Sequence, residues 1–265
     1  MIDGQEHPPA KMPIEIDVLF ESDEVLVVRK PSGMLVHNNP KYAGDKETSL
    51  RQLVGQQLGR RVYPVHRLDR ATSGTLLFAK ERDVVRQWHE RLQQGIKRYV
   101  ALVRGKSLTA QTLDHPVKTE NGARKDAVTR IFPLLSSSTE RCSLVGLELQ
   151  TGRRHQIRQH LKHLSHPIVG DTSYGKGDIN RHFRKLGMHR MALHALALVD
   201  VFPSPQDSIK TNGHVVSALV PDDLSIAFDL FLPSSWRSVA ENFAQKGAFF
   251  VEESSQSPSK QEENT

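Results

Sequence analysis

Residues 66–80 read HRLDRATSGTLLFAK: one aspartate, Asp69, lies between two arginines, and three small residues and an apolar run follow. The Thr-Ser-Gly triplet predicts a tight turn, because glycine adopts positive φ without strain. The apolar run at 75–80 predicts a buried strand. Asp69 is then held at the end of a sheet, where a rigid carboxylate can serve as a nucleophile or a base. A surface salt-bridge cluster beside a turn accounts for the same residues.

Short β-branched runs alternate with amphipathic segments on both sides of this stretch. Strands are expected within 17–37 and at 75–80, 97–105, 126–132, 143–150 and 192–202. Helices are expected at 48–59, 81–95, 153–164, 179–187 and within 222–232. The proline-containing segments 105–125 and 203–214 are expected to be loops. Several strands follow one another without a helix, so the sequence predicts the α+β class: a mixed, mainly antiparallel central sheet flanked by helices.

The chain of 265 residues is long enough for one large domain with a real core, which we expect to span residues 14–251. The flanking segments 1–13 and 252–265 are polar and without apolar periodicity, so we expect them to be disordered. No apolar run is long enough to cross a membrane, and no membrane span is expected. Cys142 is the only cysteine, which fits a reducing, cytoplasmic location.

The formal net charge is +6, with 36 Lys and Arg against 30 Asp and Glu. Four glutamates lie in residues 252–265, so the expected domain is more basic than the whole chain. Such a field attracts polyanions, of which nucleic acid is the commonest. Many basic proteins bind no nucleic acid, so the charge indicates this partner only together with a suitable site.

Thr151 opens a second charged segment, TGRRHQIRQHLKHLSHP. Its apolar spacing predicts a helix capped by Thr151, with Arg153 and Arg154 in the first turn. Positive charge there opposes the helix macrodipole, which indicates an anion such as phosphate at that end. Arg158 and Lys162 follow at four-residue intervals and extend a basic stripe. A solvated basic helix face is an equally good interpretation.

The same segment contains His155, His160, His163 and His166, which raises the question of a metal. His160 and His163 share a helix face, but the helix offers no acidic partner and its arginines repel a divalent cation. No metal is therefore expected. The chain also lacks GxxxxGK and GxGxxG phosphate loops, so no nucleotide cofactor is indicated.

Tyr99 lies in KRYVALVRG, with Lys97, Arg98 and Arg104 as basic neighbours. An aromatic ring among cations suits stacking on a nucleic-acid base. On a strand, the same ring also suits ordinary packing. The residues alone leave both interpretations open.

Five segments in chain order resemble the blocks of the RluA family of pseudouridine synthases: RKPSGMLVH, HRLDRATSG, KRYVALVRG, TGRRHQIRQHLKHLSHPIVGD and the LHA of MALHALAL. The resemblance runs from about residue 16 to residue 232. It implies the pseudouridine synthase catalytic fold, with an active-site cleft across the sheet. It also implies an enzyme that isomerises uridine in RNA to pseudouridine without cofactor or metal. RNA is then the expected partner. The resemblance does not fix the oligomeric state, for which a monomer is favoured.

The resemblance also assigns roles to residues. Asp69 matches the family's essential carboxylate, and Arg158 matches the basic residue that pairs with it. Tyr99 matches the tyrosine that stacks on the target base, and Ile157 an apolar residue that lines the base pocket. Arg67 matches the arginine that fills the gap left by the flipped uridine, because a stacked base hides its glycosidic bond. RNA contacts are expected from Arg67, Arg70, Arg153, Arg154 and His155.

Residues 167–195 resemble the TruC branch of this family, tRNA pseudouridine synthase C, which acts on uridine 65 in the T stem. Tyr174 departs from that branch, where histidine is expected, and the stretch between Thr119 and Leu144 is shorter. Lys30 comes early in the chain, so no N-terminal S4 RNA-binding domain is expected. Three alternatives remain: an RluA-like synthase acting on ribosomal RNA or another tRNA position, a non-catalytic RNA-binding protein, and a metal-dependent RNA hydrolase.

Overall fold

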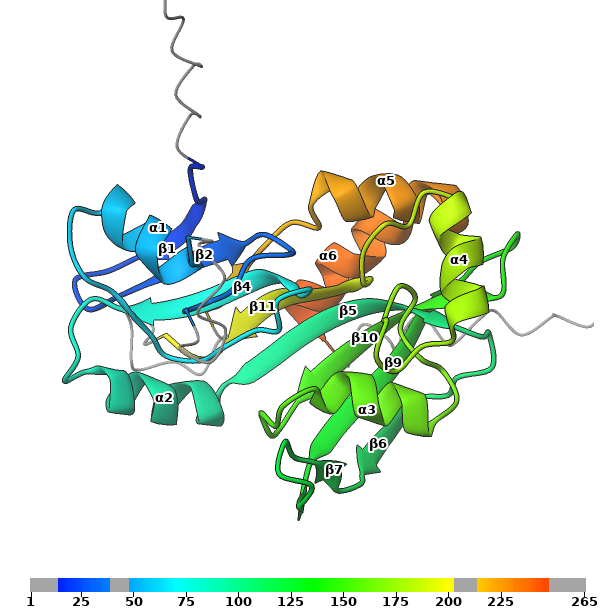
Figure 1. Ribbon diagram of the computed structural model, residues 1–265, viewed down its shortest axis with the longest axis horizontal. Helices are drawn as coiled ribbons and strands as arrows, with labels where there is room; N and C mark the ends of the chain where they lie inside the picture. Colours follow the sequence, from blue (N-terminus) through cyan, green and yellow to red (C-terminus); the bar gives the residue numbers. More distant parts are fainter. Residues whose placement is uncertain (1–13, 39–47, 203–213, 248–265) are drawn as a thin grey trace, which may run out of the picture.

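The computed structural model describes residues 14–38, 48–202 and 214–247 of the 265-residue chain (Figure 1). The segments predicted to be disordered, 1–13 and 252–265, lie outside the described residues. So does all but the last residue of the loop predicted at 203–214.

A ten-stranded sheet forms the centre of the described chain, in the order β1-β2-β4-β11-β5-β10-β9-β6, with β12 on β11 and β3 on β4. Its strands are β1 Val18–Glu21, β2 Val25–Lys30, β3 Tyr63–Pro64, β4 Ser73–Ala79, β5 Ile96–Arg104, β6 Gln111–Asp114, β9 Val128–Ser136, β10 Cys142–Leu149, β11 Leu193–Val199 and β12 Val215–Ser217. A separate hairpin consists of β7 Val117–Lys118 and β8 Arg124–Lys125. Within the main sheet β11 and β4 pair in parallel, and the other pairings are antiparallel. The predicted mixed, mainly antiparallel sheet is confirmed.

Helices pack on both faces of this sheet (Figure 1). They are α1 Leu50–Gln57, α2 Val85–Gln94, α3 Gln156–His163, α4 Gly177–Lys185, α5 Asp222–Phe231 and α6 Trp236–Lys246. Alternation along β2 explains the two layers, because successive side chains of a strand point to opposite faces. Val25 and Val27 pack in the cluster that contains Trp88 of α2. Leu26 and Val28 belong to the larger cluster on the other face, with Phe228 of α5 and other residues of α1 and α6.

One predicted loop contains strands, and one helix was not predicted. Residues 105–125 were expected to form a loop, but they contain β6, β7 and β8. These strands are short and largely polar, so they lack the apolar alternation that marks a strand. The helix that was not predicted is α6, although Trp236, Ala240 and Phe243 are buried at helical spacing. The other predicted helices and strands are present within a few residues of their expected ends.

Candidate active site

Asp69 begins the turn that leads into β4. This turn spans Asp69 to Thr72, whereas the sequence placed it at the Thr72-Ser73-Gly74 triplet, of which Ser73 and Gly74 belong to the strand. The backbone N–H of Thr72 donates to Asp69 O at 3.0 Å, which closes the turn. Ser73 and Gly74 then begin the strand, and Gly74 has a φ of +118°. A side chain at that position would collide with the backbone of Ala195 in β11, so only glycine lets the two strands approach this closely.

The segment KPSG holds this turn from the side. Lys30 Nζ is fully buried and donates to Pro31 O (2.8 Å), Arg70 O (3.0 Å) and Thr72 O (2.8 Å), which uses all three N–H groups of an ammonium. Ser32 Oγ donates to Ala71 O at 2.8 Å. Burial, followed by the charge of Arg190, lowers the pKa of Lys30 to about 7. These contacts between KPSG and the turn of Asp69 were not predicted from the sequence.

Arg158 extends from α3 to Asp69, a residue 89 positions earlier in the chain. Its Nη1 donates to Asp69 Oδ2 at 3.1 Å. The opposite edge of the guanidinium binds the buried Asp171 through Nε at 2.7 Å and Nη2 at 2.9 Å. Burial lowers the pKa of Arg158, but the hydrogen bonds to Asp171 and then Asp69 outweigh it and raise that pKa above its ordinary value. The guanidinium therefore stays charged between two carboxylates.

His155 approaches Asp69 from the other side. Its Nε2 lies 3.7 Å from Asp69 Oδ1, and its Nδ1 lies 3.2 Å from the hydroxyl of Tyr174. The residue has a φ of 53° and is the N-cap of α3. Burial lowers the pKa of His155; Arg158 and Arg154 lower it further, and the charge of Asp69 acts in the opposite direction. A neutral imidazole follows at pH 7.

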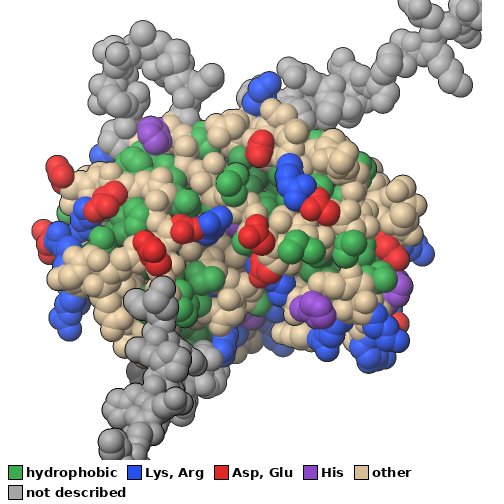
Figure 2. Space-filling model, turned by 90° about the horizontal axis from the view of Figure 1, so that it is seen from above, with side chains coloured by type: hydrophobic (Ala, Val, Ile, Leu, Met, Phe, Trp, Pro, Cys, Tyr) green, Lys and Arg blue, Asp and Glu red, His purple; other side chains and the backbone are tan. Residues whose placement is uncertain are grey.

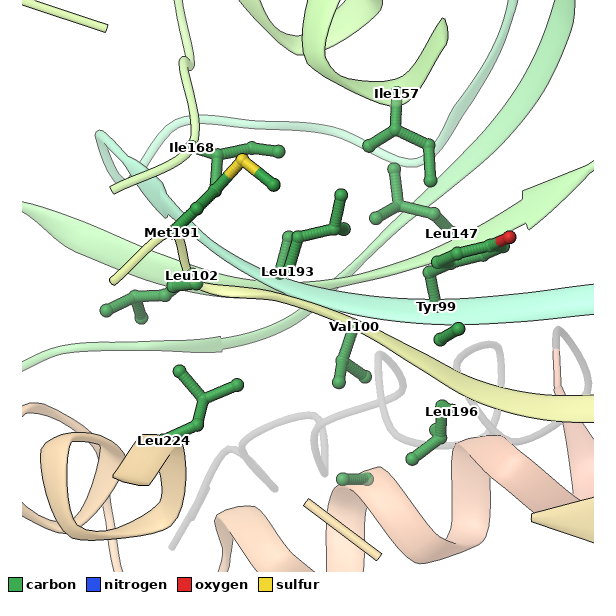
Figure 3. Packing of buried hydrophobic residues seen from close by; sticks show 14 of the residues in the cluster. Tyr99, Val100, Leu102, Leu147, Ile157, Ile168, Met191, Leu193, Leu196 and Leu224 are labelled. Carbon is green, nitrogen blue, oxygen red and sulfur yellow. The ribbon is translucent and has the colours of Figure 1, made fainter. Parts of the chain in front are cut away.

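A cleft of about 820 Å³ opens over this cluster. Seven of the nine predicted site residues line it: Arg67, Asp69, Tyr99, Arg153, His155, Ile157 and Arg158. Tyr99 of β5 is 7% exposed and Ile157 is 5% exposed, so each shows only an edge to the cleft. Figure 3 shows the Tyr99 ring on the same side of the packed cluster as Leu147 and Ile157. Burial raises the pKa of Tyr99, and the Asp69 charge raises it further, so the phenol remains protonated.

The other two predicted residues do not line the cleft. Arg70 is exposed, and its Nε donates to Gly33 O at 2.7 Å, which adds to the contacts between the two turns. Arg154 is exposed beside His155. Lys and Arg side chains gather toward the lower edge of the view in Figure 2, which is the side that faces the viewer in Figure 1.

The predicted start of α3 is wrong. The helix begins at Gln156, so Arg153 and Arg154 precede it, and Thr151 is not its cap. Instead, Gln156 Oε1 accepts hydrogen bonds from Thr151 Oγ1 (2.8 Å) and the backbone N–H of Arg153 (3.0 Å). The left-handed backbone conformation of His155 prevents α3 from extending further toward its N-terminus.

The predicted basic stripe is wrong as well, because Arg158 is 8% exposed and bound to carboxylates. His160 does not face solvent either: its ring nitrogens lie 2.9 Å from Thr129 Oγ1 and 2.9 Å from His115 O. Within the described residues, no three His, Cys, Asp or Glu side chains converge as metal ligands would. No helix in the same part of the chain is long and apolar enough to cross a bilayer.

Asp171 is the main site residue that sequence reasoning missed. Its side chain is completely buried and binds Arg158 at two points. An aspartate in a loop carries no local signal of such a partner, since Arg158 is 13 positions away and the contact depends on the tertiary path. The glycine before it, Gly170, has a φ of +81°, which places the loop against the backbone of Arg190.

Comparison with known proteins shows which family the chain belongs to. A family model described as RNA pseudouridylate synthase matches residues 24–163, which contain Asp69, Tyr99 and Arg158. The chain belongs to the RNA pseudouridylate synthase family. It is thus an enzyme of the pseudouridine synthase kind, as the resemblance of its motifs predicted.

Relatives match this pseudouridine synthase over most of its length. It is 36% identical to the tRNA pseudouridine synthase C of Haemophilus ducreyi over 241 residues, which cover 82% of this chain and 96% of the relative. The Vibrio parahaemolyticus protein of the same name is 34% identical over 243 residues, covering 83% and 96%.

Solved structures support the same fold. Human RNA pseudouridylate synthase domain containing 1 superposes with a TM-score of 0.63 at 24% identity, covering 86% of this chain and 91% of that one. Human RNA pseudouridylate synthase domain containing 4 superposes with a TM-score of 0.62 at 23% identity, covering 81% and 92%. At these identities the likeness concerns the fold alone.

Proposed function

We propose that this pseudouridine synthase acts on tRNA, with uridine 65 of the T stem as its target, and that it works as a monomer in the cytoplasm. The tRNA substrate is supported by the names of relatives that share 34% to 36% identity over more than four fifths of the chain. Position 65 is supported by the resemblance of residues 167–195 to the TruC branch.

The observation that supports Asp69 as the catalytic carboxylate is its ion pair with Arg158 in the wall of the cleft. Attack on the sugar or removal of its proton requires a carboxylate, and the Arg158 guanidinium holds this one in place. Asp69 is partly exposed, with 21% of its side chain accessible, so a substrate can reach it.

The target uridine has to leave the helical stack to reach Asp69, which costs a few kcal/mol. We assign the space between Tyr99 and Ile157 to the flipped base, because both line the cleft near Asp69. The bond between N1 of the base and C1′ of the ribose then breaks, the base rotates, and a bond forms between carbon 5 and C1′. Carbon 5 loses its proton and N1 takes one up, so the reaction is an isomerisation. The exposed Arg67 at the cleft fills the gap left in the RNA, and Arg153 and His155 contact the RNA around it.

The test is an assay on unmodified tRNA transcripts, with pseudouridine mapped by chemical modification and primer extension. We expect wild-type protein to form pseudouridine at position 65, and Asp69→Asn to abolish turnover while RNA affinity changes less than about threefold, because the amide keeps the shape but neither attacks nor accepts a proton. Asp23→Asn, an exposed aspartate in the turn before β2, is the matched control and keeps full activity.

Mapping in cells that lack the gene identifies the natural substrate. Loss of pseudouridine at tRNA position 65 supports the proposal. Loss only in ribosomal RNA, or at another tRNA position, contradicts the assigned target, and turnover by Asp69→Asn contradicts the assigned carboxylate.

A further inference from the structure

Asp171 has the contacts of an ionised carboxylate, although no part of its side chain is accessible. Its oxygens accept hydrogen bonds from Arg158 Nε (2.7 Å) and Nη2 (2.9 Å) and from the backbone N–H groups of Ser173 (2.9 Å) and Tyr174 (3.1 Å). Burial by itself raises the pKa of Asp171, but the Arg158 contacts and the two N–H groups outweigh it and hold that pKa below its ordinary value. Burying a carboxylate costs free energy unless the charge is paired and hydrogen-bonded, and these four donors meet that requirement.

The geometry of the pair fixes the direction of the guanidinium. A planar guanidinium that binds one carboxylate through Nε and Nη2 can rotate only with the loss of both hydrogen bonds. The remaining nitrogen, Nη1, is then directed away from Asp171, and it is this atom that donates to Asp69 at 3.1 Å. The single hydrogen bond to Asp69 therefore depends on the two to Asp171.

The loop of Asp171 is itself anchored without Arg158. Asp171 O accepts hydrogen bonds from the backbone N–H of Gly175 (3.0 Å) and from Asn180 Nδ2 of α4 (2.8 Å). The backbone N–H of Gly170 donates to Asn180 Oδ1 at 3.1 Å. Tyr174 from the same loop places its ring 5.0 Å from the guanidinium carbon of Arg158. The guanidinium is thus held at one edge by Asp171 and on one face by Tyr174.

We propose that Asp171 is a positioning residue of the isomerisation reaction: it orients Arg158 so that Nη1 stays on Asp69 when RNA occupies the cleft. The inference rests on the proposed function of the Asp69 site. Asp171 does not line the cleft, so it acts through Arg158. Without its charge, the guanidinium can turn toward an RNA phosphate and leave Asp69 without its partner.

A double-mutant cycle separates this role from simple support of the fold. Asp171→Asn, Arg158→Lys and the double variant are compared by kcat and KM for tRNA and by melting temperature. We expect each single variant to lower kcat about tenfold to a hundredfold with KM changed less than about threefold, because a small misplacement of a catalytic group has this effect. The double variant should be no slower than the worse single variant, within about threefold, because both changes remove the same orientation.

The matched control is Glu148→Gln. Glu148 is also a buried carboxylate that bridges two arginines, Arg98 at 3.1 Å and Arg130 at 2.9 Å, and its side chain is 4% exposed. We expect this variant to lower the melting temperature but to leave the kcat of the folded protein unchanged. Independent, multiplying effects of Asp171→Asn and Arg158→Lys on kcat would overturn the proposal, as would an unchanged kcat in Asp171→Asn.

A second measurement does not depend on activity. In ¹⁵N spectra of arginine side chains, restricted rotation about Nε–Cζ should give Arg158 separate Nη signals, assigned by their loss in Arg158→Lys. We expect these signals to merge in folded Asp171→Asn and to persist in Glu148→Gln. Separate Arg158 signals in Asp171→Asn overturn the positioning role even if the wild type makes pseudouridine. Merged signals there, with no pseudouridine formed by the wild type, overturn the proposed function alone.

Discussion

His194 of β11 and Ser73 of β4 are joined by a buried hydrogen bond, with 2.8 Å between Nδ1 and Oγ. Nε2 of the same imidazole lies 3.1 Å from Ala218 O, an atom that only accepts, so Nε2 carries the proton and Nδ1 accepts from the Ser73 hydroxyl. Arg190 Nη2 donates to Ser73 Oγ at 2.7 Å. A neutral His194 therefore links β11 to β4, the strand that follows the turn of Asp69.

This histidine predicts a dependence of stability on pH. Burial, opposed by the Ala218 carbonyl and reinforced by the charge of Arg190, lowers the pKa of His194 to about 4. The unfolded chain takes up a proton at the ordinary histidine pKa of about 6.5, so it binds more protons than the folded chain between these two values. Stability contributed by neutral His194 is thus present above pH 6.5 and is lost as the pH falls toward 4.

Urea unfolding of wild type and His194→Gln at pH 7 and pH 5 measures this effect. Glutamine keeps a donor and an acceptor but does not titrate. Between pH 7 and pH 5 we expect the free energy of unfolding of the wild type to fall by about 2 kcal/mol more than that of the variant. This follows because one titrating group contributes about 1.4 kcal/mol per pH unit, over the roughly 1.5 units below its unfolded pKa of about 6.5. Equal losses in the two proteins would show that His194 is not the titrating group.

Gly74 gives a prediction for the same strand pair. A side chain there has both a φ of +118° and a collision with the Ala195 backbone, so Gly74→Ala should lower the free energy of unfolding by about 3 kcal/mol or more. Gly33 is the matched control, since it has a φ of +83° but no atom within 4 Å of an added Cβ. Gly33→Ala should cost only about 1 kcal/mol of backbone strain. Similar losses for both variants in urea unfolding would contradict the close approach of β4 and β11.

Five motifs in chain order located much of the site, through their resemblance to a known family. The contact of Asp69 with Arg158 was expected from the motifs, and it is present at 3.1 Å. The strands were found because β-branched and apolar residues mark them, as in β4 and β10, which are buried along their whole length. Burial and local periodicity are properties that a short stretch of sequence carries.

Features set by tertiary contacts were out of reach. The hairpin of β7 and β8 is short and polar, and it is held to α3 by Gln159, whose side chain accepts from the backbone N–H of Lys118 (2.9 Å) and donates to its carbonyl (3.1 Å). The pairing of Asp171 with Arg158 depends on the path of the loop after α3. In contrast, α6 has buried apolar residues at helical spacing, a local pattern that indicates a helix, although none was predicted there.

Two substitutions of Tyr99 separate its role in base stacking from a role in proton transfer. Tyr99→Phe keeps the ring and removes the hydroxyl, whereas Tyr99→Leu removes both. If the hydroxyl handles the proton at carbon 5, Tyr99→Phe should lower kcat by about 10² or more and leave tRNA affinity within about threefold. Tyr99→Leu should in addition weaken binding by about 1–3 kcal/mol through the loss of base stacking. Single-turnover rates and filter binding measure both quantities, and full turnover by Tyr99→Phe would limit the residue to stacking and packing.

Arg153 and Arg154 test the expected contact with RNA phosphates. Both are exposed in the turn before α3, and Arg153 also lines the cleft. The double change Arg153→Gln with Arg154→Gln should weaken tRNA binding and reduce the slope of log Kd against log salt by about 1–2, because each phosphate contact contributes about 0.7–0.9 through counterion release. The kcat at saturating tRNA should stay unchanged, since neither side chain contacts Asp69.

Arg237→Gln is the control for that measurement. Arg237 is also exposed, but it is paired with Asp229 in the layer of α5 and α6, with Nη1 at 2.6 Å from Oδ1. Its loss should leave the salt dependence of tRNA binding unchanged, because a cation whose charge is balanced by a neighbouring carboxylate releases few counterions on binding. An unchanged slope in the Arg153 and Arg154 variant, or an equal change in Arg237→Gln, would place the phosphate contacts elsewhere on the basic surface.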